Sequence, residues 1–222
     1  MRSILIALPI ALSAVPASAQ DADSELWLTA TGEVAVDENT SVEVESINRF
    51  SDDSGGLYEI ELSAGVKREI GNGWWLGGGY VRVVSYSRGT VTRTEDRLRV
   101  QGGVSTDAGP FKLSGRLRLE RREASAGDEI GYRLRPNIKA ALPLGKSDFR
   151  LFASHESFFP LDDTDWGENA GHDRMRNAVG VSWKASKAIG VEAGYLHQYR
   201  LPRNGRASAT DHALTLTLGV SL

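Results

Sequence analysis

The feature that most constrains this chain is a period-two alternation of apolar and polar residues, repeated in long segments along most of its length. In the closing segment one face carries His212, Leu214, Leu216, Leu218, Val220 and Leu222, and the other face carries only small or polar residues. Successive side chains of an extended strand point to opposite faces, so this segment has one apolar face and one polar face. The sequence therefore predicts long strands that separate two different media.

The same alternation identifies eleven candidate strands. They span residues 26–36, 41–50, 57–70, 74–87, 92–104, 111–122, 130–142, 149–159, 174–184, 189–200 and 212–222. Most contain 10 to 14 residues, whereas strands of soluble proteins average about 5–6 and tilted membrane-crossing strands need about 9–11. The predicted fold is all-β, an antiparallel up-and-down transmembrane β-barrel.

The predicted connections also alternate, in length. Tight turns are expected at residues 37–40, 71–73, 106–110, 145–148 and 185–188, and mostly longer connections at 51–56, 88–91, 123–129, 160–173 and 201–211. Outer-membrane barrels have short periplasmic turns and longer external loops. The strand count conflicts with this class, because bacterial single-chain barrels have even numbers of strands. We therefore expect 12 strands, with one merged or missed, or 10, with the first segment outside the wall.

The first nineteen residues predict a secretory signal peptide. Arg2 precedes a short apolar run, and Ala17, Ser18 and Ala19 form a small-residue cleavage site. The apolar run is shorter than the about 20 residues of a spanning helix, and the chain has no cysteine for a lipid anchor, a disulfide or a thiolate metal site. Residues 20–222 are expected to form one barrel domain in a bacterial outer membrane.

The expected partners follow from this location. They are outer-membrane lipid and lipopolysaccharide, and the outer-membrane assembly machinery during biogenesis. The net charge of −3 gives no indication of nucleic-acid binding, no cofactor is expected, and the oligomeric state is left open.

Charged residues dominate the polar faces of the strands. A lumenal charge network is predicted for Arg97, Arg99, Arg116, Arg118, Arg133, Arg135, Arg150, Arg174, Arg176, Glu59, Glu61, Glu156 and Glu192. A barrel of this size is narrower than the about 16–18 strands that leave an aqueous channel. Its lumenal charges must therefore pair or contact trapped water. We expect an occluded lumen with a structural role, or slow passage of small anions, because arginine-rich pores favour anions.

Aromatic residues near the strand ends predict an interfacial belt. Its members are Trp27, Trp74, Trp75, Phe111, Phe149, Trp183, Tyr195 and Tyr199. Amphipathic rings of this kind gather at the headgroup level of a membrane. Ordinary packing in a soluble periplasmic β-sandwich that binds a ligand is the alternative explanation of the same aromatics.

One short segment could carry chemistry, because some outer-membrane barrels are lipid hydrolases with a His–Ser pair. His155 and Ser157 project to the same face of a strand, while Glu156 projects to the other. Nucleophilic catalysis also needs an orienting group and oxyanion donors, and the sequence shows neither. We therefore expect no enzymatic activity, with a lipid- or lipopolysaccharide-modifying hydrolase as the alternative. No metal site is expected, because His197 and His212 have no evident further ligands.

One set of segments lies mostly in the second half of the chain and includes the first and last strands: residues 26–28, 132–135, 142–144, 151–159, 174–181, 191–198 and 212–222. Together these segments resemble an uncharacterised bacterial family of small outer-membrane barrels, domain of unknown function 2490. The resemblance implies barrel architecture and outer-membrane location, and it transfers no activity or catalytic residue. Two positions depart from the family: similar sequences carry aspartate where His155 stands, and members commonly end in an aromatic residue rather than Leu222.

Overall fold

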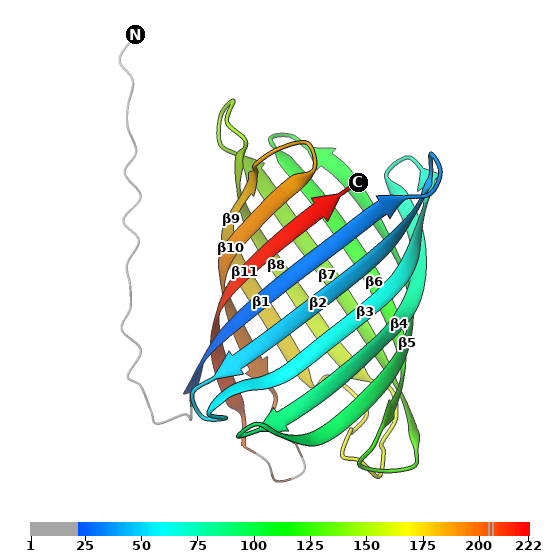
Figure 1. Cartoon of the computed structure of the whole chain (residues 1–222), viewed down its shortest axis with the longest axis vertical. Helices are drawn as coiled ribbons and strands as arrows, with labels where there is room; N and C mark the ends of the chain where they lie inside the picture. The colour runs from blue at the N-terminus through cyan, green and yellow to red at the C-terminus, as the bar shows by residue number, and fades with distance from the viewer. Residues whose placement is uncertain (1–21, 204, 206) are drawn as a thin grey trace.

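The structure is a single closed β-barrel (Figure 1). The computed structural model describes residues 22–203, 205 and 207–222, which contain eleven strands and no helix. The strands are β1 (Ala22–Ala35), β2 (Thr40–Ser51), β3 (Gly56–Gly71), β4 (Trp74–Ser87), β5 (Thr90–Ala108), β6 (Phe111–Ala124), β7 (Ile130–Pro143), β8 (Phe149–Pro160), β9 (Arg174–Lys184), β10 (Ile189–Arg200) and β11 (Ala209–Ser221). The all-β barrel prediction is confirmed, and one closed sheet excludes the β-sandwich. The predicted signal peptide, residues 1–19, lies outside the described residues.

The predicted strand number of 10 or 12 is wrong, because the barrel has eleven strands. It closes through a parallel pairing of β1 with β11, from Ala22 opposite Thr210 to Glu33 opposite Ser221. Consecutive strands pair antiparallel, as β1 does with β2 and β10 with β11. The expectation of an even number assumed antiparallel pairing throughout, whereas a parallel seam allows an odd number to close. The first segment therefore belongs to the wall.

The two ends of the barrel differ in their connections. The loop end holds the longer connections at residues 125–129, 161–173 and 201–208, and the opposite turn end holds tight turns such as Asn72–Gly73. One predicted longer connection is a two-residue turn instead: Arg88 and Gly89 both have positive φ, 49° and 78°, as a type I′ hairpin requires. β1 begins at the loop end, and β11 ends at the turn end (Figure 1).

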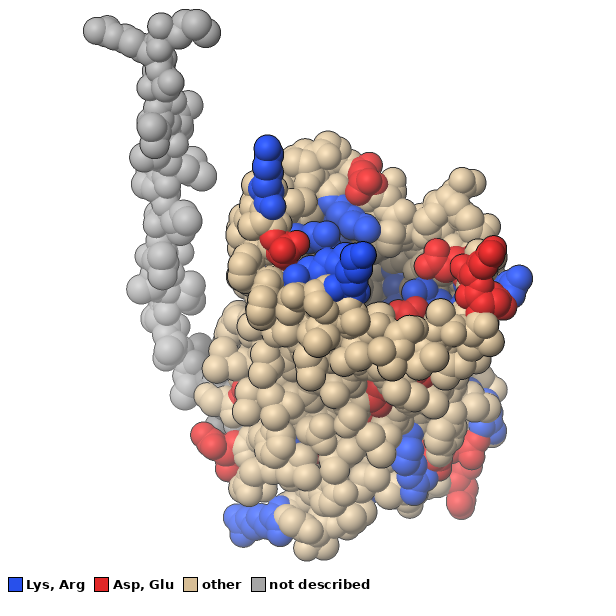
Figure 2. Space-filling view, turned by 45° about the horizontal axis from the view of Figure 1, so that its top comes forward, with Lys and Arg blue, Asp and Glu red and all other residues tan. Residues whose placement is uncertain are grey.

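The distribution of polarity is inverted relative to a soluble domain. Large apolar side chains are exposed on every strand, for example Leu98, Leu117 and Leu214. The buried residues include many charged groups, such as Glu120 and Arg133, which soluble proteins seldom bury. Figure 2 shows a largely uncharged wall, with charged residues gathered in the hollow at the turn end and near the rims. Within the described residues, no helix is long and apolar enough to cross a membrane.

Candidate functional site in the barrel lumen

Glu120 is at the centre of the lumenal charge network. This carboxylate projects inward from β6 and is 1% exposed. It accepts hydrogen bonds from Nε and Nη2 of Arg133, at 2.8 and 2.6 Å, and from Nη1 of Arg135 at 2.9 Å. The two arginines alternate on β7, where Arg133 is directly opposite Glu120. Several charge-assisted bonds to one carboxylate offset the large cost of removing it from water.

Two further carboxylates extend the network around the wall. Glu156 on β8 accepts from Nη2 of Arg116 at 2.5 Å and from Nη2 of Arg135 at 3.0 Å. Glu95 on β5 accepts from Arg97 Nε at 2.5 Å and from Arg122 Nε at 2.6 Å. Arg135 therefore joins the carboxylates of two different strands, and the network runs from β5 to β8.

The remaining predicted network residues occupy two regions. Glu61 lies 3.2 Å from Arg97 and 3.7 Å from Arg49, which also pairs with Glu59. Arg99 donates to Ser63 Oγ at 3.1 Å, and Arg118 donates to Gln101 Oε1 at 2.8 Å. These residues continue the network.

Arg150 and Glu192 are separate from it. Both line a side cavity against β8 to β11 near the turn end, and Lys139 donates to Glu192 at 2.6 Å. Arg150 and Glu192 therefore lie on the inner face of the barrel wall, as the network does, but in another part of the lumen.

Aromatic rings also contact several of the lumenal arginines, both those that pair with carboxylates and those that do not. Phe158 is 2% exposed, and its centroid lies 4.5 Å from the guanidinium carbon of Arg135, 4.7 Å from that of Arg176 and 5.4 Å from that of Arg174. Arg176 also lies over the ring of Trp27 at 4.6 Å and donates to Gln198 Oε1 at 2.7 Å. Ring faces attract guanidinium groups, so part of the positive charge is held without a neutralising acid.

The residues of the predicted aromatic belt are divided between the outer wall and the lumen. Its residues Trp74, Phe111, Phe149, Trp183 and Tyr195 are exposed on the outer wall, and Tyr199 is half-buried. Phe149 stacks on Trp183, with 5.8 Å between the ring centroids. Four of these residues, Trp74, Phe111, Phe149 and Trp183, lie next to tight turns.

Trp27 and Trp75 were wrongly assigned to the belt, because both line the lumen. Trp27 is two residues after Glu25, so both side chains point to the inner face of β1. Trp27 Nε1 donates to Glu25 at 2.5 Å, and Trp27 is 6% exposed. Trp75 follows the outward Trp74 and must therefore point inward. Gly103 leaves room for the ring, since a Cβ at Gly103 would lie 2.7 Å from Trp75 atoms.

Three cavities follow one another along the lumen. The loop-end cavity is about 260 Å³, a middle cavity about 230 Å³ and a turn-end cavity about 290 Å³. Neighbouring cavities share lining residues: Arg49, Glu61, Arg135 and Arg176 between the first two, and Glu45, Arg116 and Arg118 between the last two. Ion-paired side chains thus divide the lumen into compartments.

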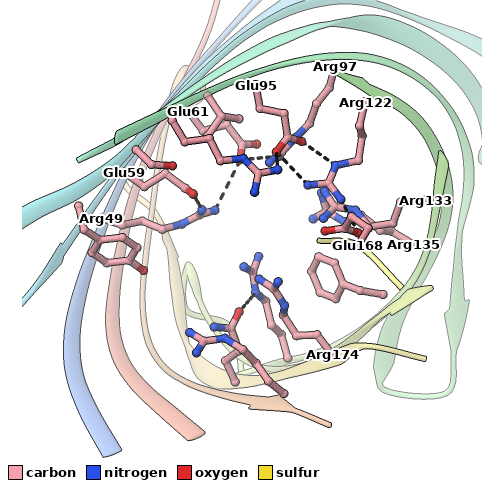
Figure 3. A pocket seen from close by; sticks show the side chains of 18 residues that line it. Arg49, Glu59, Glu61, Glu95, Arg97, Arg122, Arg133, Arg135, Glu168 and Arg174 are labelled. Carbon is pink, nitrogen blue, oxygen red and sulfur yellow. Dashed lines mark hydrogen bonds and ion pairs between the residues drawn. The ribbon is translucent and has the colours of Figure 1, made fainter. Parts of the chain in front are cut away.

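The loop-end cavity carries an excess of positive charge. Its lining includes nine arginines and four glutamates. Figure 3 shows guanidinium groups, among them Arg49, Arg97 and Arg174, converging on its open centre. The turn-end cavity is balanced, with three arginines and three glutamates in its lining.

The β8–β9 loop reaches into the loop end of the lumen. Its Glu168 pairs with Arg122 at 2.6 Å, and its Trp166 lies under the guanidinium groups of Arg93 and Arg122, at 4.9 and 5.0 Å. Burial opposes ionisation of Glu168, but Arg122 and Arg133 outweigh burial and lower the pKa of its carboxyl below the usual value. The sequence predicted a longer connection at residues 160–173 but no contact with the lumen.

The His–Ser pair lies on the opposite, outer face of β8. His155 Nε2 is 3.0 Å from Ser157 Oγ, while Glu156 between them points into the lumen. The predicted separation of the two faces is confirmed. The pair takes no part in the lumenal network.

The comparisons with known proteins give a family without an assigned activity. Residues 24–209 match the family described as Protein of unknown function (DUF2490). An uncharacterized protein of Methylorubrum extorquens is 33% identical over 234 residues, covering 99% of this chain and 97% of the relative.

Three solved structures are similar at low sequence identity. The translocator domain of the autotransporter NalP from Neisseria meningitidis has a TM-score of 0.49 and 18% identity, covering 79% of this chain and 72% of that chain. An anion-selective porin from Comamonas acidovorans has a TM-score of 0.41 and 10% identity, covering 82% of this chain and 53% of that chain. OmpT of Vibrio cholerae has a TM-score of 0.40 and 13% identity, covering 77% of this chain and 58% of that chain. The match over most of its length shows that the chain belongs to the DUF2490 family of proteins of unknown function.

Proposed function

We propose that this protein is an integral barrel of the bacterial outer membrane with a passive role, slow anion-preferring passage of small solutes through a narrow lumen. The outer wall supports membrane insertion. Exposed apolar side chains on all eleven strands would be an extreme aggregation liability in water, whereas lipid acyl chains accommodate them. The lumenal charges then remain inside the barrel, where they pair with one another.

The arginine excess of the loop-end cavity is the observation that carries the anion preference. Nine arginines line this cavity against four glutamates. Most of the nine also pair with an acid, but the close contacts of Arg176 are neutral groups, Gln198, Trp27 and Phe158. An anion entering from the loop end would therefore meet positive charge, while the ion pairs between cavities would keep its passage slow.

Membrane insertion is tested by fractionation and by heat-modifiable migration on a gel. Recovery with the outer membrane, and a faster-migrating unheated form, are the expected results. Recovery of the folded protein in the soluble periplasm would reject membrane insertion.

Anion passage is tested in planar bilayers with purified full-length protein under a KCl gradient. We expect small, infrequent conductance with a reversal potential of anionic sign, and a smaller anion preference for the Arg174→Gln, Arg176→Gln double variant. These substitutions remove positive charge while leaving the principal carboxylates with other arginines. Lys187→Gln, in an exposed turn, is the control and should behave as the parent protein. Conductance no greater than that of the lipid alone would reject passage.

A further inference from the structure

Three polar side chains on the outer wall form a hydrogen-bonded chain across β8 and β9. His155 and Ser157 are two residues apart on β8, and Asn177 is directly opposite His155 on β9. His155 Nδ1 lies 2.8 Å from Asn177 Oδ1, and His155 Nε2 lies 3.0 Å from Ser157 Oγ. The three groups are therefore arranged in the order amide, imidazole and hydroxyl.

The amide fixes the direction of these hydrogen bonds. A side-chain amide oxygen can only accept, so His155 Nδ1 carries the proton and donates it to Asn177 Oδ1. His155 Nε2 then has a free lone pair and accepts from the hydroxyl of Ser157. This is the tautomer that a general base needs in order to take a proton from serine, with a third group holding the ring in place.

The surroundings of Ser157 are those of an apolar wall near the loop end of the barrel. Ser157 is 7% exposed and lies three residues before the loop end of β8. Met175 is opposite it on β9, and the next outward residue, Phe159, stacks on His172 at 4.6 Å. On the other side the β7–β8 pairing skips Arg135 and Pro136, because proline has no backbone N–H to donate.

We propose that Ser157, His155 and Asn177 form a hydrolytic site for fatty-acyl carboxylic esters of membrane lipids. The proposal rests on the membrane insertion proposed above, because only then do lipid esters lie beside this part of the wall. A position near a strand end suits such esters, which join the acyl chains to the headgroup region. It departs from the sequence-based expectation of a non-enzymatic barrel, because the orienting group missing from the sequence is present as Asn177.

The chemistry has two steps. Ser157 Oγ forms a bond to the ester carbonyl carbon while His155 Nε2 takes the hydroxyl proton. The carbon–oxygen bond to the lipid alcohol then breaks, and His155 returns the proton to the departing oxygen. Water attacks the resulting acyl-serine with His155 again as the base, which releases the fatty acid and restores Ser157. Ser157 and His155 are the catalytic residues, and Asn177 is a positioning residue.

Fatty-acid release from phosphatidylethanolamine vesicles and from purified lipopolysaccharide tests the proposal with folded, full-length protein. Two substrate arms distinguish a glycerolipid ester from an acyl ester of lipopolysaccharide. We expect release from at least one of them, reduced at least about 100-fold by Ser157→Ala and by His155→Ala. Ser154→Ala is the matched control, since it makes the same change on the same strand but on the lumenal face, and release should be unchanged.

Asn177 and the nucleophile each have an independent readout. Asn177→Ala should reduce release about 10-fold or more, and Asn177→Asp should restore part of it. In the Asp variant the acidic limb of the pH–activity profile should move to higher pH, because a carboxylate beside the ring favours the imidazolium. A fluorophosphonate should label the parent protein and the Ser154→Ala variant but not the Ser157→Ala variant.

Two results would overturn the proposal. One is no fatty-acid release from either lipid by protein that is heat-modifiable and embedded in the membrane, together with no fluorophosphonate labelling. The other is release that persists unchanged in Ser157→Ala. Failure of membrane insertion is recognised separately, by recovery of the protein in the soluble fraction, and would remove the proposed function as well.

Discussion

At the scale of single residues, the buried carboxylate of Glu120 is the most consequential charge in the barrel. Arg133 and Arg135 both donate to it, so its removal takes away the carboxylate that Arg133 contacts and leaves Arg135 with Glu156 alone. Glu120→Gln should lower the free energy of unfolding by about 3–5 kcal/mol, the cost of breaking a buried ion pair. Denaturant unfolding of the folded protein in detergent micelles measures this change.

The matched control is Glu123→Gln, which makes the same chemical change on the outer side of the same strand. Glu123 pairs with Arg121, and its side chain is half-exposed, so the expected loss is about 1 kcal/mol or less. Equal losses for the two variants would contradict the central position of Glu120 in the network.

The sequence could predict which face of the barrel wall each strand residue occupies, whereas it could not predict the contacts between strands. The alternation placed Arg97, Arg116 and Glu156 inside, and the same rule applied to Trp27 would have placed it there too. Asn177 was missed because its contact depends on the register of β8 against β9, which the intervening loop sets. The bridging position of Arg135 between Glu120 and Glu156 has the same origin.

At the scale of elements, the β8–β9 loop is held against the lumen by an ionisable contact. The pKa of Glu168 is lowered in the folded protein, so its contribution to loop docking is complete above the usual carboxyl range. That contribution is lost as the pH falls through the lowered pKa. Glu168→Gln should speed hydrogen exchange of residues 161–173 at neutral pH, and the variant and the parent should converge in acid.

The control for the loop is Asp128→Asn, an exposed acid in the adjacent connection at the loop end. Its exchange should match that of the parent protein at both pH values. Unchanged exchange in Glu168→Gln at neutral pH would show that Trp166 and the backbone contacts hold the loop without the ion pair.

At the scale of the whole molecule, the parallel seam determines how the barrel closes. Ala30 on β1 is opposite Leu218 on β11. Because the chain has no native cysteine, an Ala30→Cys, Leu218→Cys double variant can form only this intramolecular disulfide. We expect it to cross-link on oxidation and to keep the heated protein in a compact, faster-migrating form on a non-reducing gel.

A register-shifted pair, Ala30→Cys with Leu214→Cys, is the control. Four residues along a strand correspond to about 13 Å, which is beyond the reach of a disulfide. Cross-linking of this pair as efficient as that of the matched pair would contradict the register of the seam. The alternation identified eleven strands, but the expectation of an even number replaced that count, because period-two patterning does not fix how the first and last strands meet.

If the barrel inserts into a membrane as proposed, the seam also limits how the chain can enter it. The loop end joins β2 to β3, β4 to β5, β6 to β7, β8 to β9 and β10 to β11, so these strands can cross as hairpins with their loops leading. β1 has no partner in such a hairpin. If the turns face the periplasm, β1 must cross as a single strand with its N-terminal end leading. The beginning of β1 and the end of β11 then lie on opposite sides of the membrane, where side-specific labels attached to each would find them.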